Sequence, residues 1–310
     1  MAKDHSTTSP TGNVRGIYYA LAAFMLWGFL PLYWKTLQSF SAGIILANRI
    51  IWSALFVFCL LKKRNQMSMV KAVVRDKQKL FLVFLSAVII SGNWFVYIWA
   101  VNANHVIEAS MGYYINPLIV ILMGMLILKE KLNRMEGAAI ILAFAGVFFI
   151  TWQYGQVPWI SLFLATSFAL YGLCKKMVQV DSLVALGLET VILTPLAIVY
   201  LVANRSTLMH TLQSVSWVTV ALLVLSGVLT ALPLLWFAQA AKLVTMSILG
   251  FSQYLSPSIS LLLGIFLFRE PFTSTHVISF ALIWSGLLIF SLAQTHKIHH
   301  PKKHPPKEAV

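Results

Sequence analysis

Long apolar runs alternate with short polar connectors along almost the whole chain. Ten of these runs are long enough to cross the roughly 30 Å of hydrocarbon in a lipid bilayer as helices. Because the connectors are short, there is no room for a separate soluble domain. The pattern therefore predicts an all-α membrane protein with ten transmembrane helices. The predicted spans are residues 17–36, 43–61, 80–101, 107–128, 134–151, 158–176, 183–203, 217–241, 246–268 and 274–294.

The fourth predicted span opens on the unusually polar stretch "EASMGYYINP", residues 108–117. Its proline, Pro117, lies well inside the span, where it removes one helical hydrogen bond and frees the carbonyl of Tyr113. Pro257 does the same in the ninth span and frees the carbonyl of Gln253. A bent helix with a polar stripe suits a substrate pathway. The alternative is that the prolines only let the helices bend and pack closely.

The two prolines belong to a longer internal repeat. A shift of 140 residues superimposes Pro117 on Pro257 and Tyr114 on Tyr254, and it also pairs Gly124 with Gly264 and Glu130 with Glu270. The repeat holds five helices, an odd number, so its second copy must be inverted in the membrane. Inverted repeats are typical of secondary transporters, with the substrate bound between the halves. We expect a tail at 1–15, repeats at 16–152 and 153–294, and a basic His/Pro-rich cytoplasmic tail at 295–310.

Composition and charge agree with this picture. Apolar residues make up 59% of the chain and charged residues 10%, against about 25% charged in soluble proteins. Most of the 23 Lys and Arg, Lys175 and Lys176 included, fall in segments that are cytoplasmic if the N-terminus is inside. This bias predicts two cytoplasmic termini. It also makes anionic lipid headgroups the expected partners of the basic loops despite a net charge of +14, with no nucleic acid bound.

The sequence lacks the motifs of several other protein classes. Cys59 and Cys174 fall within spans, where they are expected to fill space. No GxxxxGK[ST] loop, HExxH motif or GxSxG elbow is present, so we expect no ATP-driven step, no metal site, no cofactor and no enzyme activity.

Three quoted stretches carry a family resemblance. "IEASMGYYINPLIVILMGMLILKEKL" and the ten-helix plan resemble the EamA-type permeases of the drug/metabolite transporter superfamily. "SGNWFVYIWAVNANHVIEASMGYYINP" and "GFSQYLSPSISLLLGIFLFRE" are similar to its RarD branch. The resemblance runs from about residue 15 to 293. It implies a bacterial inner-membrane carrier with five-plus-five inverted helices, whose site lies between the third, fourth, eighth and ninth spans, beside the first and sixth.

Two charges lie well inside the predicted spans, Arg49 and Glu189, and they are also 140 residues apart. Charges within a membrane are expensive and are functional candidates by default. We predict that each anchors one gate and that Glu189 is able to carry a proton. For Arg49 the alternative is a side chain that reaches the outer interface. For Glu189 it is a protonated structural carboxyl.

The predicted substrate site combines aromatic rings with amide and hydroxyl groups, which suits a flat or amphipathic ligand. For the tryptophans the alternative is a role as interface anchors. The candidate residues are Asn93, Trp94, Tyr97, Tyr113, Asn116, Trp236, Gln239, Gln253, Tyr254 and Ser256.

The sequence thus predicts a secondary transporter that moves a small organic metabolite or amphipathic drug by alternating access, as an exporter or a facilitator. A membrane enzyme acting on a lipid-linked substrate and a sensor or scaffold without transport remain the alternatives. A homodimer is an option that the sequence leaves open.

Overall fold

The computed structural model describes residues 10–102, 106–153, 155, 159–178, 180–267 and 274–299. Regular structure in these residues is helical, with no strand. The predictions for Glu270 and for residues 300–310 lie outside this part. The helices are α1 (Pro10–Thr36), α2 (Ala42–Lys63), α3 (Met67–Arg75), α4 (Lys77–Asn102), α5 (Val106–Leu126), α6 (Arg134–Gln153), α7 (Trp159–Met177), α8 (Ser182–Ala203), α9 (Arg205–Ser214), α10 (Trp217–Leu243), α11 (Met246–Gln253), α12 (Leu255–Phe266) and α13 (Ser274–His299).

Each predicted span coincides with a helix, except that the ninth is divided into α11 and α12. Among the described residues, six helices are long and apolar enough to cross a membrane: α1, α2, α4, α6, α8 and α10. Two shorter apolar stretches, Gly112–Leu126 and Val277–Ala293, lie in α5 and α13. The all-helical class is therefore confirmed, whereas the count of ten spans stays a prediction.

Two short helices, α3 and α9, were not expected from the hydrophobic pattern. Each follows the second long helix of its repeat and precedes the third. Asp76, between α3 and α4, accepts hydrogen bonds from the backbone N–H groups of Gln78 and Lys79. The Lys79 ammonium lies 3.0 Å from the same carboxylate. Hydrogen bonding by Lys79 lowers the pKa of Asp76, so this exposed carboxylate holds the start of α4 in its charged form.

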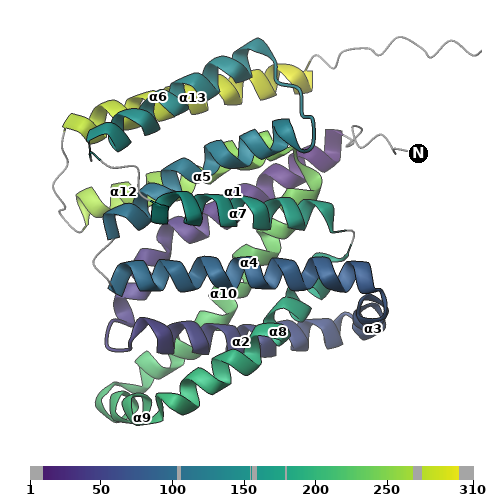
Figure 1. The fold of residues 1–310 in the computed structure, drawn as a ribbon, viewed down its shortest axis with the longest axis vertical. Coiled ribbons are helices and arrows are strands. Elements are labelled where there is room, and N and C mark those ends of the chain that lie inside the picture. Colours follow the sequence, from purple (N-terminus) through teal and green to yellow (C-terminus); the bar gives the residue numbers. More distant parts are fainter. Residues whose placement is uncertain are drawn as a thin grey trace, which may run out of the picture. The chain divides into compact units, whose positions relative to one another are not determined.

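The described part divides into two compact units, which we treat separately (Figure 1). The larger unit contains α1–α5 and α7–α12, and the smaller one contains α6 and α13. In the larger unit, α4 packs against α7 and α8, and its repeat counterpart α10 packs against α1 and α2. Likewise α5 packs against α7, and α11 and α12 pack against α1. In each case a helix of one repeat packs against helices of the other repeat, and the equivalent helix of the other repeat makes the equivalent contacts. Two related halves would produce this symmetry.

In the smaller unit, α6 and α13 lie side by side along their length (Figure 1). A Cβ atom added to Gly146 of α6 would lie 2.7 Å from the carbonyl oxygen of Ser279 in α13, so the close approach requires glycine. At the start of α6, the side chains of Asn133 and Glu136 each accept a hydrogen bond from the other residue's backbone N–H, both at 2.7 Å. This reciprocal cap satisfies two donors that a helix end otherwise leaves open.

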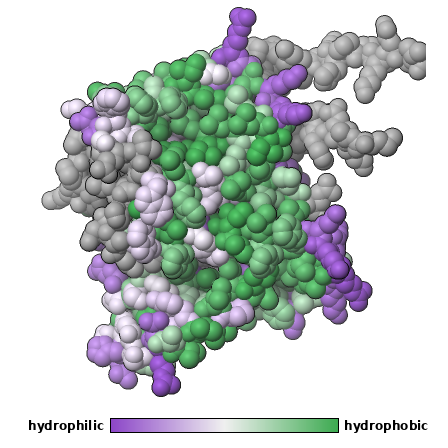
Figure 2. All heavy atoms as spheres, viewed as in Figure 1, coloured by the Kyte–Doolittle hydropathy of each residue, from purple (hydrophilic) through white to green (hydrophobic). Residues whose placement is uncertain are grey.

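Large apolar side chains are exposed along the sides of the helices. Phe81 and Phe95 of α4 are 62% and 69% exposed, and Phe144 of α6 is 59% exposed. On the face drawn in Figure 2, apolar side chains cover the middle of the helices and polar ones gather near their ends. A water-soluble surface rarely carries so much contiguous apolar area, whereas a lipid-facing surface requires it.

Candidate substrate pathway

A small cavity lies inside the larger unit, between α2, α4, α7, α8 and α10. The space open to the centre of a water molecule is about 10 Å³, which is enough for about one water. Both repeats contribute to its wall. Apart from isoleucine and leucine side chains, the wall consists of Ser53, Trp94, Tyr171, Glu189, Thr190 and Thr230.

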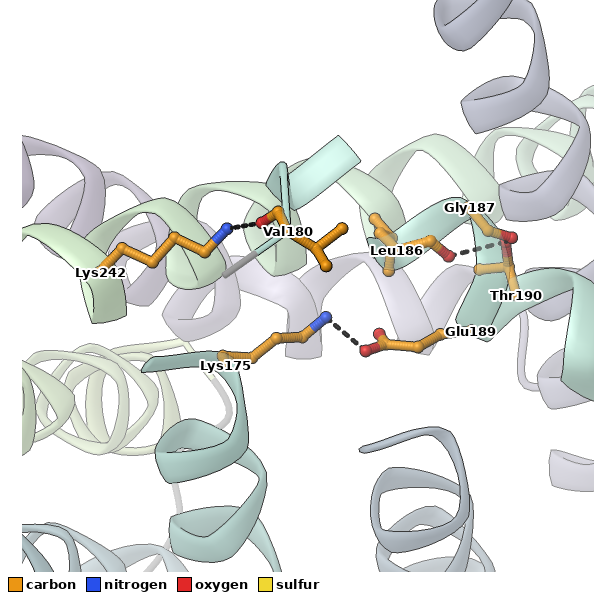
Figure 3. Close-up of polar contacts among 7 residues, drawn as sticks. All are labelled: Lys175, Val180, Leu186, Gly187, Glu189, Thr190 and Lys242. Carbon is orange, nitrogen blue, oxygen red and sulfur yellow. Dashed lines mark hydrogen bonds and ion pairs between the residues drawn. The ribbon is translucent and has the colours of Figure 1, made fainter. Parts of the chain in front are cut away.

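Glu189 of α8 forms a buried ion pair at this cavity. The Nζ atom of Lys175, in the last turn of α7, lies 2.5 Å from Oε1 of Glu189, and the two side chains are only 2% and 3% exposed. In Figure 3 the two side chains extend toward each other from neighbouring helices. The same ammonium lies 5.1 Å from the ring centroid of Tyr171, within the range of a cation–π contact. The pair therefore joins α7 to α8 by a charge contact that is shielded from solvent.

Two further lysines bind carbonyl oxygens at the same end of these helices. Lys176 donates to the carbonyl oxygens of Ala241, at 3.2 Å, and Val244. Lys242, in the last turn of α10, donates to the carbonyl of Val180 (Figure 3). We call the contacts of Lys175, Lys176 and Lys242 the lysine end. They connect α7, α8 and α10, all of which come from the second repeat.

Arg49 of α2 occupies a different environment. Its Nε atom donates to Oγ1 of Thr230 in α10 at 2.8 Å, and its guanidinium carbon lies 4.6 Å and 5.6 Å from the ring centroids of Trp34 and Trp94. Nearby, the Tyr33 hydroxyl donates to the carbonyl of Leu222. We call the contacts of Tyr33, Trp34 and Arg49 the arginine end. They join α1 and α2 of the first repeat to α10 of the second.

The two ends adjoin the same cavity from different sides. Thr230 and Trp94 line the cavity and also hold Arg49, whereas Glu189 lines it and holds Lys175. Arg49 and Glu189 therefore have separate partners. In this structure Arg49 is hydrogen-bonded to α10 and Glu189 has a cationic partner.

Two predicted site residues hold helix α7 in place. Asn93 of α4 donates to the carbonyl of Leu164 at 2.9 Å and to the Ser167 hydroxyl at 2.8 Å. Asn116 of α5 donates to the carbonyl of Ala165 at 2.6 Å. Both amides are buried. In this structure they connect α4 and α5 to α7, and their donors are used within the protein.

The predicted aromatic site is only partly assembled. Trp94 lines the cavity. The rings of Tyr97 and Tyr113 contact each other, with centroids 6.0 Å apart, but neither residue lines the cavity. Trp236 and Gln239 are half-buried on α10, also away from the lining. The cavity thus includes the third and eighth spans of the predicted site (α4 and α10) and the sixth beside them (α7), but no residue of the fourth or ninth span lines it.

The two prolines differ in their effect. α5 continues without interruption through Pro117, whereas the ninth span is interrupted at Tyr254, between α11 and α12, shortly before Pro257. At this junction Gln253 and Tyr254 are buried, and their side-chain polar atoms have no hydrogen-bond partner. Ser256, the next candidate, is half-buried there. The junction therefore contains polar groups whose hydrogen-bonding capacity is unused.

The α5–α11 contact near the prolines is close. A Cβ atom added to Gly250 of α11 would lie 2.8 Å from the carbonyl oxygen of Pro117. The side chain of Ile121 would be 2.7 Å away. This leaves no room for a water-filled passage between these helices in the state described.

Lys175 is the buried charged residue of this site that sequence reasoning missed, because it was counted with the loop charges. A signal for it exists: Tyr171 and Lys175 are four residues apart and lie on one face of α7. The side of the helix that carries Tyr171 is buried, so Lys175 must be buried as well.

Comparisons with known proteins agree with this architecture. A model of the EamA-like transporter family matches residues 14–152. The chain is 44% identical over 293 residues to "Uncharacterized transporter YojE" of Bacillus subtilis, covering 94% of this chain and 98% of that protein. It is 41% identical over 278 residues to "Protein RarD" of Escherichia coli, covering 89% and 93%. "Chloramphenicol-sensitive protein RarD" of Pseudomonas aeruginosa is more distant, at 27% identity over 281 residues, covering 89% and 93%.

A solved structure, described only as "Crystal structure of protein", has the same fold. Its TM-score is 0.69 at 18% sequence identity, with 91% of this chain and 98% of the other chain covered. The exposed apolar helices, the buried charges and the relatives together define a multi-pass membrane transporter, and the chain belongs to the EamA-like transporter family. Within the drug/metabolite transporter superfamily it is a RarD-type permease, which confirms the resemblance seen in the sequence.

Proposed function

We propose that this protein is a secondary transporter that moves a small organic metabolite or amphipathic drug by alternating access. The observation that carries the proposal is that the lysine end and the arginine end, each held by non-covalent contacts between helices, adjoin one buried cavity. A carrier needs a gate on each side of its site, and a closed state with both gates shut leaves little free volume. The lysine end and the arginine end are the two candidate gates, and the cavity of about 10 Å³ fits a closed state.

The exchanged helix pairs support a rocking motion of the two repeats. With ten spans as two inverted five-helix repeats, one movement that opens the first side closes the other. Residues 16–152 and 153–294 are the proposed repeats. The arginine end connects the two repeats through α2 and α10. Breaking that contact is therefore a necessary step in opening its side.

Glu189 is the proposed coupling residue. It is the carboxylate of the cavity wall, and its charge is balanced by Lys175. Exchange of a proton at Glu189 would change the strength of that ion pair and so bias the lysine end. In the simpler alternative, the same carrier moves its substrate by facilitated flux, without coupling to any ion gradient. Since the sequence carries no nucleotide-binding loop, neither version uses ATP.

We propose the inner membrane of a bacterium as the location, with both termini and the lysine end on the cytoplasmic side. The positive-inside bias supports this orientation. Lys71, Arg75 and Lys79, on and beside α3, would then lie at the headgroups of the inner leaflet, where anionic lipids attract basic side chains. A small-molecule substrate and these lipids are the proposed partners, and self-association into a homodimer is compatible with them.

Counterflow tests this proposal. Purified protein is placed in proteoliposomes preloaded with one unlabelled compound, and uptake of the labelled compound is followed for a panel of amino acids, metabolites and amphipathic drugs. A carrier gives transient accumulation that saturates with concentration. Flux without saturation would indicate a channel, binding without flux a sensor, and chemical conversion of a lipid-linked compound an enzyme. Repeating the assay with a pH gradient distinguishes proton coupling from facilitated flux.

A further inference from the structure

The cation held at Glu189 has a complete binding site around it. The ammonium of Lys175 contacts the Glu189 carboxylate at 2.5 Å and lies over the Tyr171 ring at 5.1 Å. A carboxylate next to an aromatic face is the combination with which proteins bind organic ammonium groups. Here the ammonium belongs to the protein itself, and the Tyr171 ring is fixed by stacking on Phe237, with ring centroids 5.9 Å apart.

One buried hydroxyl group at the same cavity has no hydrogen-bond partner, and a second faces the carboxylate. Ser53 is 1% exposed and its Oγ forms no hydrogen bond, whereas the fully buried Tyr171 hydroxyl lies close enough to Glu189 to interact with it. Unpartnered polar groups in an apolar interior cost free energy, and their presence is explained when a ligand uses them in another state. Both residues line the cavity together with Glu189, so the two hydroxyl groups and the carboxylate are close to the same space.

The remaining charges limit the ligand to one positive charge. Lys242 lies close enough to interact electrostatically with Glu189, and its ammonium is held on the carbonyl of Val180. A second positive charge on a ligand would meet that ammonium with no further carboxylate among the lining residues. The rest of the wall is Ile, Leu and Trp94 with Thr190 and Thr230, whose hydroxyls donate to the carbonyls of Leu186 and Ser226 in their own helices, so it suits an apolar or aromatic body.

We propose that Glu189 and Tyr171 form an ammonium subsite, in which Lys175 occupies the place of the protonated amine of a transported aromatic or apolar monoamine. The inference rests on the proposed carrier function and deepens it by naming the substrate class. In the closed state the site is occupied by its own lysine. Loading requires Lys175 to withdraw and the substrate ammonium to take its place, so an empty, unpaired Glu189 is avoided at each stage.

Equilibrium binding to the purified full-length protein in nanodiscs provides the test. The labelled probe is 2-phenylethylamine, competed by its neutral analogue 2-phenylethanol and by the anionic 3-phenylpropanoate. The wild-type protein is expected to bind the amine at least about tenfold more tightly than either analogue, since only the amine replaces the buried cation. Equal binding of the three compounds would overturn the proposal without the need for any variant.

Variants separate the subsite from a structural ion pair. Lys175→Met removes the internal competitor and is expected to tighten amine binding by about tenfold, because a larger fraction of the protein is then free to bind. Glu189→Gln, and the double variant Lys175→Met with Glu189→Gln, are expected to lose the preference for the amine. Lys175→Arg keeps a cation that competes with the amine for Glu189, so the affinity of this variant for the amine should not rise. Lys79→Met, which removes an exposed lysine of similar size, is the matched control.

The outcomes distinguish this inference from the carrier proposal. Amine preference that persists in Glu189→Gln, or an unchanged amine affinity in folded Lys175→Met, overturns the subsite. Saturable counterflow of neutral or anionic compounds without amine binding leaves the carrier in place and overturns the subsite as well. Amine binding that depends on Glu189 without counterflow supports the subsite and contradicts transport.

Discussion

The lysine end and the arginine end both hold a buried cation between helices, but they neutralise it differently. Lys175 has a full countercharge in Glu189, at 2.5 Å. Arg49 has two tryptophan faces and the hydroxyl of Thr230. The first contact links helices of one repeat, whereas the second joins α2 of one repeat to α10 of the other. The comparison separates a strong charge contact within one repeat from a weaker contact between the two repeats.

This difference has an energetic consequence. Removing one partner of a buried ion pair leaves an uncompensated charge, which costs much more than the pair contributes on balance. Removing Arg49 leaves only a neutral hydroxyl and two aromatic rings without their cation. The arginine end is therefore better suited to break and re-form during a transport cycle, while the lysine end is expected to change only when another cation or a proton replaces Lys175.

The largest loss of stability is expected when only one partner of the Lys175–Glu189 ion pair is removed. Lys175→Met should lower the free energy of unfolding by about 3–5 kcal/mol, because Glu189 stays buried without a partner. Adding Glu189→Gln should recover most of that loss. Thermal unfolding of the detergent-solubilised protein, followed by fluorescence-detected size-exclusion chromatography, measures both. A double variant as unstable as the single one would show that the orphaned charge is not the cause.

A smaller effect is expected at the arginine end. Arg49→Met should cost about 2–3 kcal/mol of stability, the sum of a cation–π contact and one hydrogen bond to a charged group, each near the low end of its range. The same thermal assay applies. A loss equal to that of Lys175→Met would contradict the comparison, since it would require a countercharge near Arg49. Arg49→Lys is the control that keeps the charge and removes the planar guanidinium.

The contribution of Thr230 is expected to be smaller still. Thr230→Val should cost about 1 kcal/mol by removing the hydroxyl that accepts from Arg49. In a double-mutant cycle with Arg49→Met, the Thr230 effect should shrink, because its partner is already gone. Strictly additive effects would mean that the hydroxyl matters mainly through its bond to the carbonyl of Ser226.

The smallest effect is expected at a surface ion pair of the same chemical type. Asp76 and Lys79 are 3.0 Å apart and both side chains are exposed. Solvent screens such a pair, so Asp76→Gln should leave the apparent melting temperature within the scatter of replicate scans. A clear drop would indicate that the cap on α4 contributes more than the ion pair, which Asp76→Asn, a residue that still caps, would then restore.

The helices were predictable because their apolar runs are long and bounded by polar connectors. The positions of Arg49 and Glu189 inside spans were equally predictable, because each charge is flanked on both sides by the apolar residues of its span. α3 and α9 were missed because short helices at a membrane surface lack a long apolar run. The ion pair to Lys175 was missed because the sequence shows where a helix ends but not how deeply that end is packed.

The proline pair shows a second limit of pattern-based prediction. The sequence places Pro117 and Pro257 in equivalent positions, yet α5 stays continuous while the chain is interrupted between α11 and α12. A proline permits a bend, but neighbouring helices decide whether it occurs. Close packing of α5 on α7 and of Gly250 on Pro117 gives α5 its support. Asn93 and Asn116 were predicted as site residues for their chemistry. In the structure they donate to backbone carbonyls of α7, and Asn93 also donates to the Ser167 hydroxyl.

The pairing of α6 with α13 affects how the chain is made. α6 ends at Gln153, and its partner α13, the last helix of the described residues, begins only at Ser274. At about 5–20 residues per second, α6 waits roughly 6–24 s in lipid before its partner is synthesised. Its exposed apolar residues, such as Ile141 and Phe144, tolerate that wait, while its close-packed glycine face stays uncovered until α13 has been synthesised.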